Sequence, residues 1–318
     1  MQTDNPTFTP VRQYCFSIYE QPAMIPQSAL RRSLISPIGR ISPSVTHCFS
    51  TTAVPNERAS AVANNPPARP HGIDPRWLTT MKRRVGKCIS FGLKPAQIKP
   101  AGDILQQLAH DWRELLAGSE GFLTDAKRRS LYKHNVVWGE MDVMGHVNNV
   151  TYVRYAESAR VNWTRNIGMH IDAANREKWF NLLNSRGIGL ILRSIKVDYK
   201  FPMTFPDKIT VYQKLVHNPD SALSSQSAFQ LQVMILSEAR QRPAARCHED
   251  IVTYDYRKQR KTAQLPPFIL EQFKTMWQLQ EQAKMEWQKK IADLENRVRN
   301  LELSSWDRKD AVEDTGSA

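Results

Sequence analysis

The sequence has few cysteines and no long apolar run. Its four cysteines form no C-x-x-C pair and no metal-ligand spacing, which favours free thiols in a reducing compartment. No hydrophobic stretch approaches the ~18 consecutive apolar residues that a membrane-spanning helix requires. We therefore expect no transmembrane segment, no bound metal and no cofactor.

Acidic residues are absent from residues 21–56, although this stretch contains Arg31, Arg32, Arg40 and many Ser and Thr. Such a composition is typical of an organelle transit peptide, because a basic segment is drawn toward the import machinery and the negative membrane potential. Prolines interrupt it too often for the apolar core of a secretory signal. The sequence thus predicts a location in the mitochondrial matrix, with a plain disordered N-terminus as the alternative.

The net charge of +13 raises the question of a nucleic-acid partner. Much of the basic excess lies before residue 100, and the rest is spread thinly. The sequence contains no recognisable helix-turn-helix, zinc-finger or RNA-binding pattern. We therefore expect no nucleic-acid partner. The 41% of hydrophobic residues is enough for a sizeable globular core.

Apolar spacing divides the chain into a central domain with simpler segments on both sides. Two amphipathic helices are expected at about 75–91 and 101–116. Beyond Pro267, apolar residues at 3-4 heptad spacing predict a coiled coil, and a helix packed on its own subunit is the alternative. The predicted organisation is a transit peptide or disordered segment at 1–52, a linker at 53–73, a helical lead-in at 74–128, the central domain at 129–260, a C-terminal helix at 266–303 and a disordered tail at 304–318.

In the central domain, the spacing of apolar residues changes from a period of two residues to a period of 3.6 and back to two. A strand is predicted at residues 136–138, followed by a long helix that begins near Asn149. Four further strands are expected where apolar side chains alternate, at residues 188–201, 208–216, 229–235 and 251–256. One long helix against one antiparallel sheet is an α+β layer arrangement.

One short segment carries residues suited to chemistry. Asp142 lies in a turn, Gly145 permits a tight backbone, and His146 follows. Asn148 or Asn149 can cap the next helix, whose free N–H groups favour an oxyanion. A carboxylate, an imidazole and a helix start suffice for acyl transfer or hydration. The alternative is a turn in which Asp142 and His146 only satisfy backbone groups.

The run Asp142-x-x-Gly145-His146-Val147-Asn148-Asn149-x-x-Tyr152 resembles the signature of the 4-hydroxybenzoyl-CoA thioesterase family of hotdog proteins, and it is also similar to plant acyl-ACP thioesterases. The resemblance covers about residues 130–258. It implies a hotdog fold, in which a five-stranded antiparallel sheet wraps a long central helix. The helical N-terminal lead-in and the long C-terminal helix lie outside it.

The resemblance also implies roles for the site residues. Asp142 would act on an acyl-thioester as general base or nucleophile, and His146 would orient. Gly145, Asn148 and Asn149 would position the carbonyl oxygen. Met144 stands where the acyl-ACP enzymes usually have Asn, which favours a CoA thioester over an acyl-carrier thioester.

The same resemblance implies a homodimer, or a dimer of dimers, with the thioester held between subunits. Two other functions stay open: a non-catalytic hotdog scaffold, and a carrier-protein thioesterase of a biosynthetic pathway. The Asn-Pro-x-His setting of hotdog hydratases is absent from the sequence.

Five further residues have simpler expected roles. Glu140, two positions before Asp142, is expected to be solvated. Glu157 and Arg160 are three residues apart on the helix and are expected to pair with each other. Cys247 has His248 beside it on a strand, which places the two side chains on opposite faces and argues against a nucleophilic pair.

Overall fold

The computed structural model describes residues 73–221 and 226–312, all of which belong to one unit of the chain, Asn64–Ala318. The transit peptide predicted at 1–52 lies outside the described residues, and so do the linker up to residue 72 and residues 313–318 of the predicted tail.

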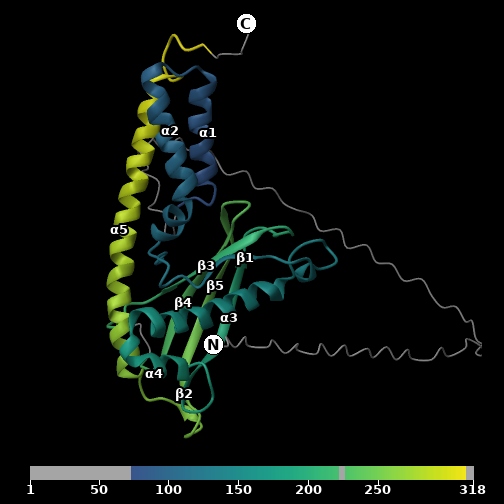
Figure 1. The fold of residues 1–318 in the computed structure, drawn as a ribbon, viewed down its shortest axis with the longest axis vertical. Helices are drawn as coiled ribbons and strands as arrows, with labels where there is room; N and C mark the ends of the chain where they lie inside the picture. The colour runs from purple at the N-terminus through teal and green to yellow at the C-terminus, as the bar shows by residue number, and fades with distance from the viewer. Residues whose placement is uncertain (1–72, 222–225, 313–318) are drawn as a thin grey trace, which may run out of the picture. The chain divides into compact units, whose positions relative to one another are not determined.

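Within the described residues, one antiparallel sheet has the strand order β1-β3-β4-β5-β2, and β6 adds to β5 (Figure 1). Each of the four strands predicted after the long helix is present, which confirms the α+β class. The strands are β1 (Leu131–Asn135), β2 (Ile188–Tyr199), β3 (Lys208–Leu215), β4 (Ala228–Ser237), β5 (Arg242–Asp255) and β6 (Arg260–Lys261).

The strand predicted at residues 136–138 is wrong. β1 ends at Asn135, and Trp138–Glu140 forms a short 3-10 turn. The Val137 N–H donates to the Glu140 carboxylate at 2.9 Å. This local bond satisfies a backbone N–H that would otherwise need an acceptor on a neighbouring strand. The chain therefore turns here instead of extending β1.

Helix α3 (Asn149–Asn166) packs on one face of the sheet, against β1, β3, β4 and β5 (Figure 1). The core between them contains Tyr152, Tyr155, Ala156 and Ala159 of α3 and apolar side chains of the strands. Ala156 and Ala159 are fully buried, and their small size brings the helix close to the sheet. A π-helical turn at Ile167–Ile171, a 3-10 turn at Ala173–Asn175 and α4 (Arg176–Asn181) follow α3.

The helical segments outside the central domain cover part of the opposite face of the sheet. They are α1 (Trp77–Ser90), α2 (Pro95–His110), a π-helical turn at Glu114–Gly118 and α5 (Pro267–Ser304). They share one core with Tyr212 of β3 and with Met234 and Leu236 of β4. α2 begins earlier than its apolar pattern predicts, because Pro95 is favoured at the first position of a helix.

The apolar seam of α5 is buried within its own chain. Leu294 and Val298 pack with α1 and α2, and Phe273 packs with α3 and β4. Arg84 of α1 holds the end of α5 through both carboxylate oxygens of Glu302. The structure therefore shows a helix packed on its own subunit. None of the helices in the described residues has the length and apolar composition to span a membrane.

Candidate functional site

Residues 142–146 form a closed turn just before α3. The Asp142 N–H donates to the His146 carbonyl at 2.8 Å, and the Gly145 N–H donates to the Asp142 carbonyl at 3.0 Å. Met141 and Val147 pair across the base of the turn. Gly145 has φ +73°, a left-handed conformation that glycine adopts without strain, so this residue type allows the turn to close.

The Asp142 carboxylate is half-buried and held by the turn itself. Its Oδ1 accepts from the Met144 N–H at 2.9 Å and from the His146 N–H at 3.4 Å. These are the contacts expected for a turn in which the carboxylate satisfies backbone groups. They also fix its orientation, and within the described residues Oδ2 takes no part in a hydrogen bond.

Asp142 and His146 meet through the backbone of His146, with no bond between the carboxylate and the imidazole. The sequence spacing therefore brings the two residues together in one turn without making them a side-chain pair.

The turn leads directly into the start of α3. Asn148 caps the helix, since its side-chain oxygen accepts from the Val150 N–H at 3.1 Å, and its own N–H donates to the Glu140 carbonyl at 2.9 Å. Asn149 is exposed in the first turn, and its carbonyl accepts from the Tyr199 hydroxyl at 3.1 Å. The predicted cap is confirmed, and the positive end of the helix lies beside the Asp142 turn.

Sequence reasoning missed the pair formed by Glu140 and Tyr155. The Tyr155 hydroxyl donates to Glu140 Oε2 at 2.6 Å, and the same carboxylate accepts from Val137. Burial raises the pKa of the Tyr155 hydroxyl, and the bond to Glu140 adds to the effect, so Tyr155 stays protonated as a donor. The expectation of a solvated Glu140 is wrong. The sequence offered one indication that Tyr155 is buried: it lies three residues after Tyr152, on the same face of the helix.

Large apolar side chains are exposed around the Asp142 turn. Val143 is fully exposed, Met144 is 73% exposed, and the exposed rings of Trp138 and Phe205 meet edge to face at 5.9 Å. The structure contains cavities of about 560 Å³ and 240 Å³, and neither borders Asp142. A single chain thus presents the site as an open, partly apolar surface.

Two other expectations are settled by contacts in the core. Arg160 does not pair with Glu157; it donates to Glu249 of β5 at 2.5 Å, and both side chains of this pair are largely buried. Burial, with a smaller contribution from the nearby Glu249 carboxylate, raises the pKa of the Cys247 thiol to about 12. A thiol held protonated in this way is a poor nucleophile.

Comparison with known proteins finds a family model that is similar to part of the chain. Residues 136–273 match the model of the Thioesterase-like superfamily, a stretch that includes the Asp142 turn and α3. A search of curated proteins finds no match.

Similar solved structures include a thioesterase from Thermus thermophilus complexed with coenzyme A and Zn (22% identity, 49% of this chain and 96% of that chain, TM-score 0.36). Another is the DHNA-CoA thioesterase from Staphylococcus aureus (18% identity, 53% of this chain and 93% of that chain, TM-score 0.34).

Proposed function

We propose that the protein hydrolyses an acyl-thioester, with CoA as the carrier, at the Asp142 turn. One observation carries the proposal: the segment that matches the Thioesterase-like superfamily contains a carboxylate fixed beside the start of α3, with one oxygen left without a partner in the described residues. A carboxylate next to the positive end of a helix suits attack on a carbonyl whose oxygen becomes negative.

Asp142 has two possible roles in this reaction. As general base, it takes a proton from water while the water oxygen adds to the carbonyl carbon. As nucleophile, its Oδ2 adds to that carbon and forms an anhydride that water then cleaves. In both cases the C–S bond breaks and the thiolate leaves, taking up a proton. We assign the carbonyl oxygen to the Asn149 N–H at the start of α3, since the N–H groups of Gly145 and Asn148 donate to the Asp142 and Glu140 carbonyls and shape the turn. We assign an orienting role to His146.

The carrier assignment rests on Met144. Its side chain is exposed and offers no amide to a thioester. This position therefore lacks the group expected in an acyl-ACP enzyme, and CoA is the carrier that we propose. A carrier-protein thioesterase is the competing assignment.

Hydrolysis of a panel of acyl-CoAs, from short to long and with aryl members, tests the proposal. Free thiol release by the full chain should exceed that of the Asp142→Asn variant for at least one acyl group. An acyl-carrier protein loaded with the same acyl groups forms the second arm. Turnover of the carrier-protein thioesters alone would replace CoA, and no turnover in either arm would favour a non-catalytic scaffold.

We further propose that two copies form a homodimer that completes the site. β2 is the end strand of the sheet, and no strand of the described residues pairs with its outer edge, where the Leu190 N–H donates to the Leu182 carbonyl. A twelve-residue edge rich in Ile, Leu and Val is a template for a second strand. A second copy docked there would wall in the open surface around Val143 and Met144. A dimer of dimers is the alternative assembly.

Exposed methionines offer a matched test of the dimer. Met144→Asp puts a charge into the apolar surface beside the site, whereas Met285→Asp makes the same change on α5, at a methionine that is 64% exposed. Light scattering should show dissociation or weaker association for Met144→Asp only, with a loss of turnover. Equal masses and equal rates for both variants would exclude the Met144 surface from the interface.

Mitochondrial import remains a proposal from the acid-free N-terminal segment. N-terminal sequencing of the native protein should find that about the first 50 residues are removed, since this composition ends near Glu57. A mature chain that starts at Met1, found outside mitochondria, would contradict import.

A further inference from the structure

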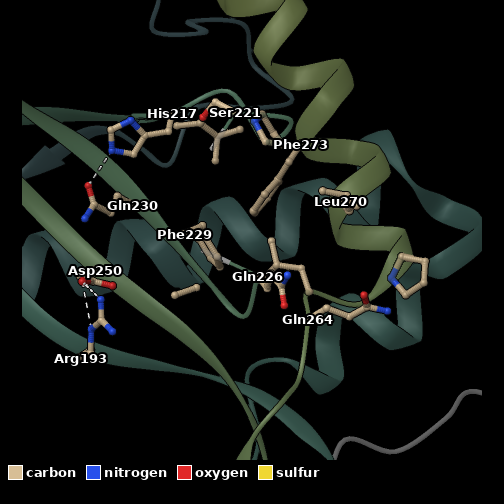
Figure 2. A pocket seen from close by; sticks show the side chains of 15 residues that line it. Arg193, His217, Ser221, Gln226, Phe229, Gln230, Asp250, Gln264, Leu270 and Phe273 are labelled. Carbon is tan, nitrogen blue, oxygen red and sulfur yellow. Dashed lines mark hydrogen bonds and ion pairs between the residues drawn. The ribbon is translucent and has the colours of Figure 1, made fainter. Parts of the chain in front are cut away.

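The cavity of about 560 Å³ lies between the sheet and the first turns of α5 (Figure 2). Its inner wall is apolar: Leu215, Leu265 and Phe273 are buried, and Ala228 is almost fully buried. The Phe229 and Phe273 rings meet edge to face, with centroids 4.8 Å apart. Figure 2 shows Phe229, Leu270 and Phe273 converging on this space from β4 and α5.

Imperfect packing does not account for a space of this size. Protein interiors are close-packed, with few voids larger than a water molecule. Pockets for small molecules typically measure about 300–1,000 Å³ and combine apolar walls with a few polar groups. The cavity falls within that range, and its lining combines an apolar wall with several polar side chains.

The cavity is separate from the Asp142 site. Trp163 packs against Phe273 at the cavity end of α3, with ring centroids 6.0 Å apart. Asn149, at the other end of α3, lies fourteen residues earlier, which is about 21 Å at 1.5 Å per residue. A ligand in the cavity therefore does not occupy the position of a thioester carbonyl at Asp142.

The mouth of the cavity is polar and close to neutral in charge. Exposed amides of Gln226, Gln230 and Gln264 surround it. The Nε2 atom of His217 lies 3.2 Å from Oε1 of Gln230. Among the described residues that line the cavity, Arg193 carries a guanidinium, and the Asp250 carboxylate binds it through two of its nitrogens (Figure 2). Side-chain amides both donate and accept, so they complement a neutral amide or hydroxyl group better than an anion.

We propose that this cavity is a second binding site, for an uncharged amphipathic molecule with an aryl or alkyl body and an amide or hydroxyl head. The body fills the space beside Phe229 and Phe273. The head meets the glutamine amides at the mouth. Arg193 is neutralised by Asp250, so a carboxylate head gains little there. Binding at this site is independent of thioester hydrolysis.

Naphthamide and naphthoate test the proposal, since they share one ring system and differ in head charge. Ligand-observed NMR on the full chain, with no thioester present, gives both affinities. Naphthamide should bind at least about tenfold more tightly, a difference near 1.4 kcal/mol. Asp250→Asn removes the negative charge and frees Arg193, so the preference should shrink about tenfold or reverse.

A pair of substitutions on α5 locates the binding. Leu270→Trp places an indole in the cavity and should abolish naphthamide binding. Leu303→Trp makes the same change at an exposed leucine of the same helix and should leave binding intact. Thermal melts check that both variants are folded. Unchanged binding in Leu270→Trp, or equal affinity of the two naphthalenes for the wild-type chain, would overturn the proposal.

Discussion

The two ends of α3 differ in what surrounds them. At the start, the Asp142 turn provides a carboxylate with one oxygen unpartnered in the described residues, on an open surface. At the far end, Trp163 is buried against Phe273 of α5, which lines a cavity with an open mouth. The Asp142 carboxylate and the larger cavity therefore lie at opposite ends of α3 within one chain. An enzyme needs both in one place, and this is why we assign the missing wall at Asp142 to a second copy.

The strongest test of this contrast is at the buried end. Trp163→Ala should lower the free energy of unfolding by about 4 kcal/mol, because it leaves a large cavity in the core. Turnover per folded molecule should stay at the wild-type level, since Trp163 lies a helix length from Asp142. Denaturant titration and active-site-normalised rates measure the two effects.

If Trp163→Ala does not fold, Trp163→Phe provides the same comparison at a smaller cost. A variant that keeps its stability but loses turnover would show that the buried end of α3 takes part in the chemistry, and the contrast between the two ends would fail.

At the start of α3 the expected effects are reversed, with a loss of turnover and little change in stability. Asp142→Asn should cut thioester turnover at least ~100-fold, in the range of a lost general base. The folded state should be nearly unaffected, because the amide oxygen of Asn still accepts from the Met144 and His146 N–H groups. A melt and a thiol-release assay on the same preparation decide this. A near-wild-type rate would remove Asp142 from the mechanism.

The sequence predicted the elements well where periodicity is regular. The helix start at Asn149 and the existence of the four later strands follow from spacing alone, because a half-buried helix or strand must repeat its apolar face. The last strand, β5, begins at Arg242, nine residues before the predicted start at residue 251. The strand predicted at residues 136–138 failed for a local reason. A Glu140 side chain that bonds a backbone N–H three residues earlier leaves no trace in apolar alternation.

Contacts between distant residues were beyond sequence reasoning. Arg160 and Glu249 are 89 positions apart, and only the folded packing of α3 on β5 brings them together. The seam of α5 has the same spacing whether it meets a partner helix or its own chain, so the heptads left both readings open. The Asp142 turn was identified because all its groups are local in sequence.

Tyr155 provides a test of how rigidly the open end is held. Tyr155→Phe deletes the donor to Glu140 and keeps the ring in the core, so the segment before Asp142 loses one anchor. We expect kcat to fall about tenfold with KM little changed, as for lost positioning of a catalytic group. Steady-state kinetics measure the split between kcat and KM.

Tyr212→Phe is the matched control for Tyr155→Phe. Tyr212 is buried on the other face of the sheet, and its hydroxyl has no hydrogen-bond partner in the described residues, so deleting that hydroxyl should leave kcat unchanged. Equal kinetics in the two variants would mean that the bond between Glu140 and Tyr155 stabilises the fold without positioning Asp142.

The smallest expected effect concerns His146. Its imidazole makes no bond to the Asp142 carboxylate, and its contribution to the turn comes from backbone groups that alanine also has. His146→Ala should therefore reduce turnover by only a few-fold, the cost of a lost orienting group rather than of a lost base. The double variant with Asp142→Asn completes a cycle in which the two losses should multiply. If His146→Ala alone is as inactive as Asp142→Asn, and the double variant is no worse, the two side chains act as one unit during catalysis. That result would mean that substrate binding rotates the imidazole toward the carboxylate, and the open end of α3 would then carry a coupled pair.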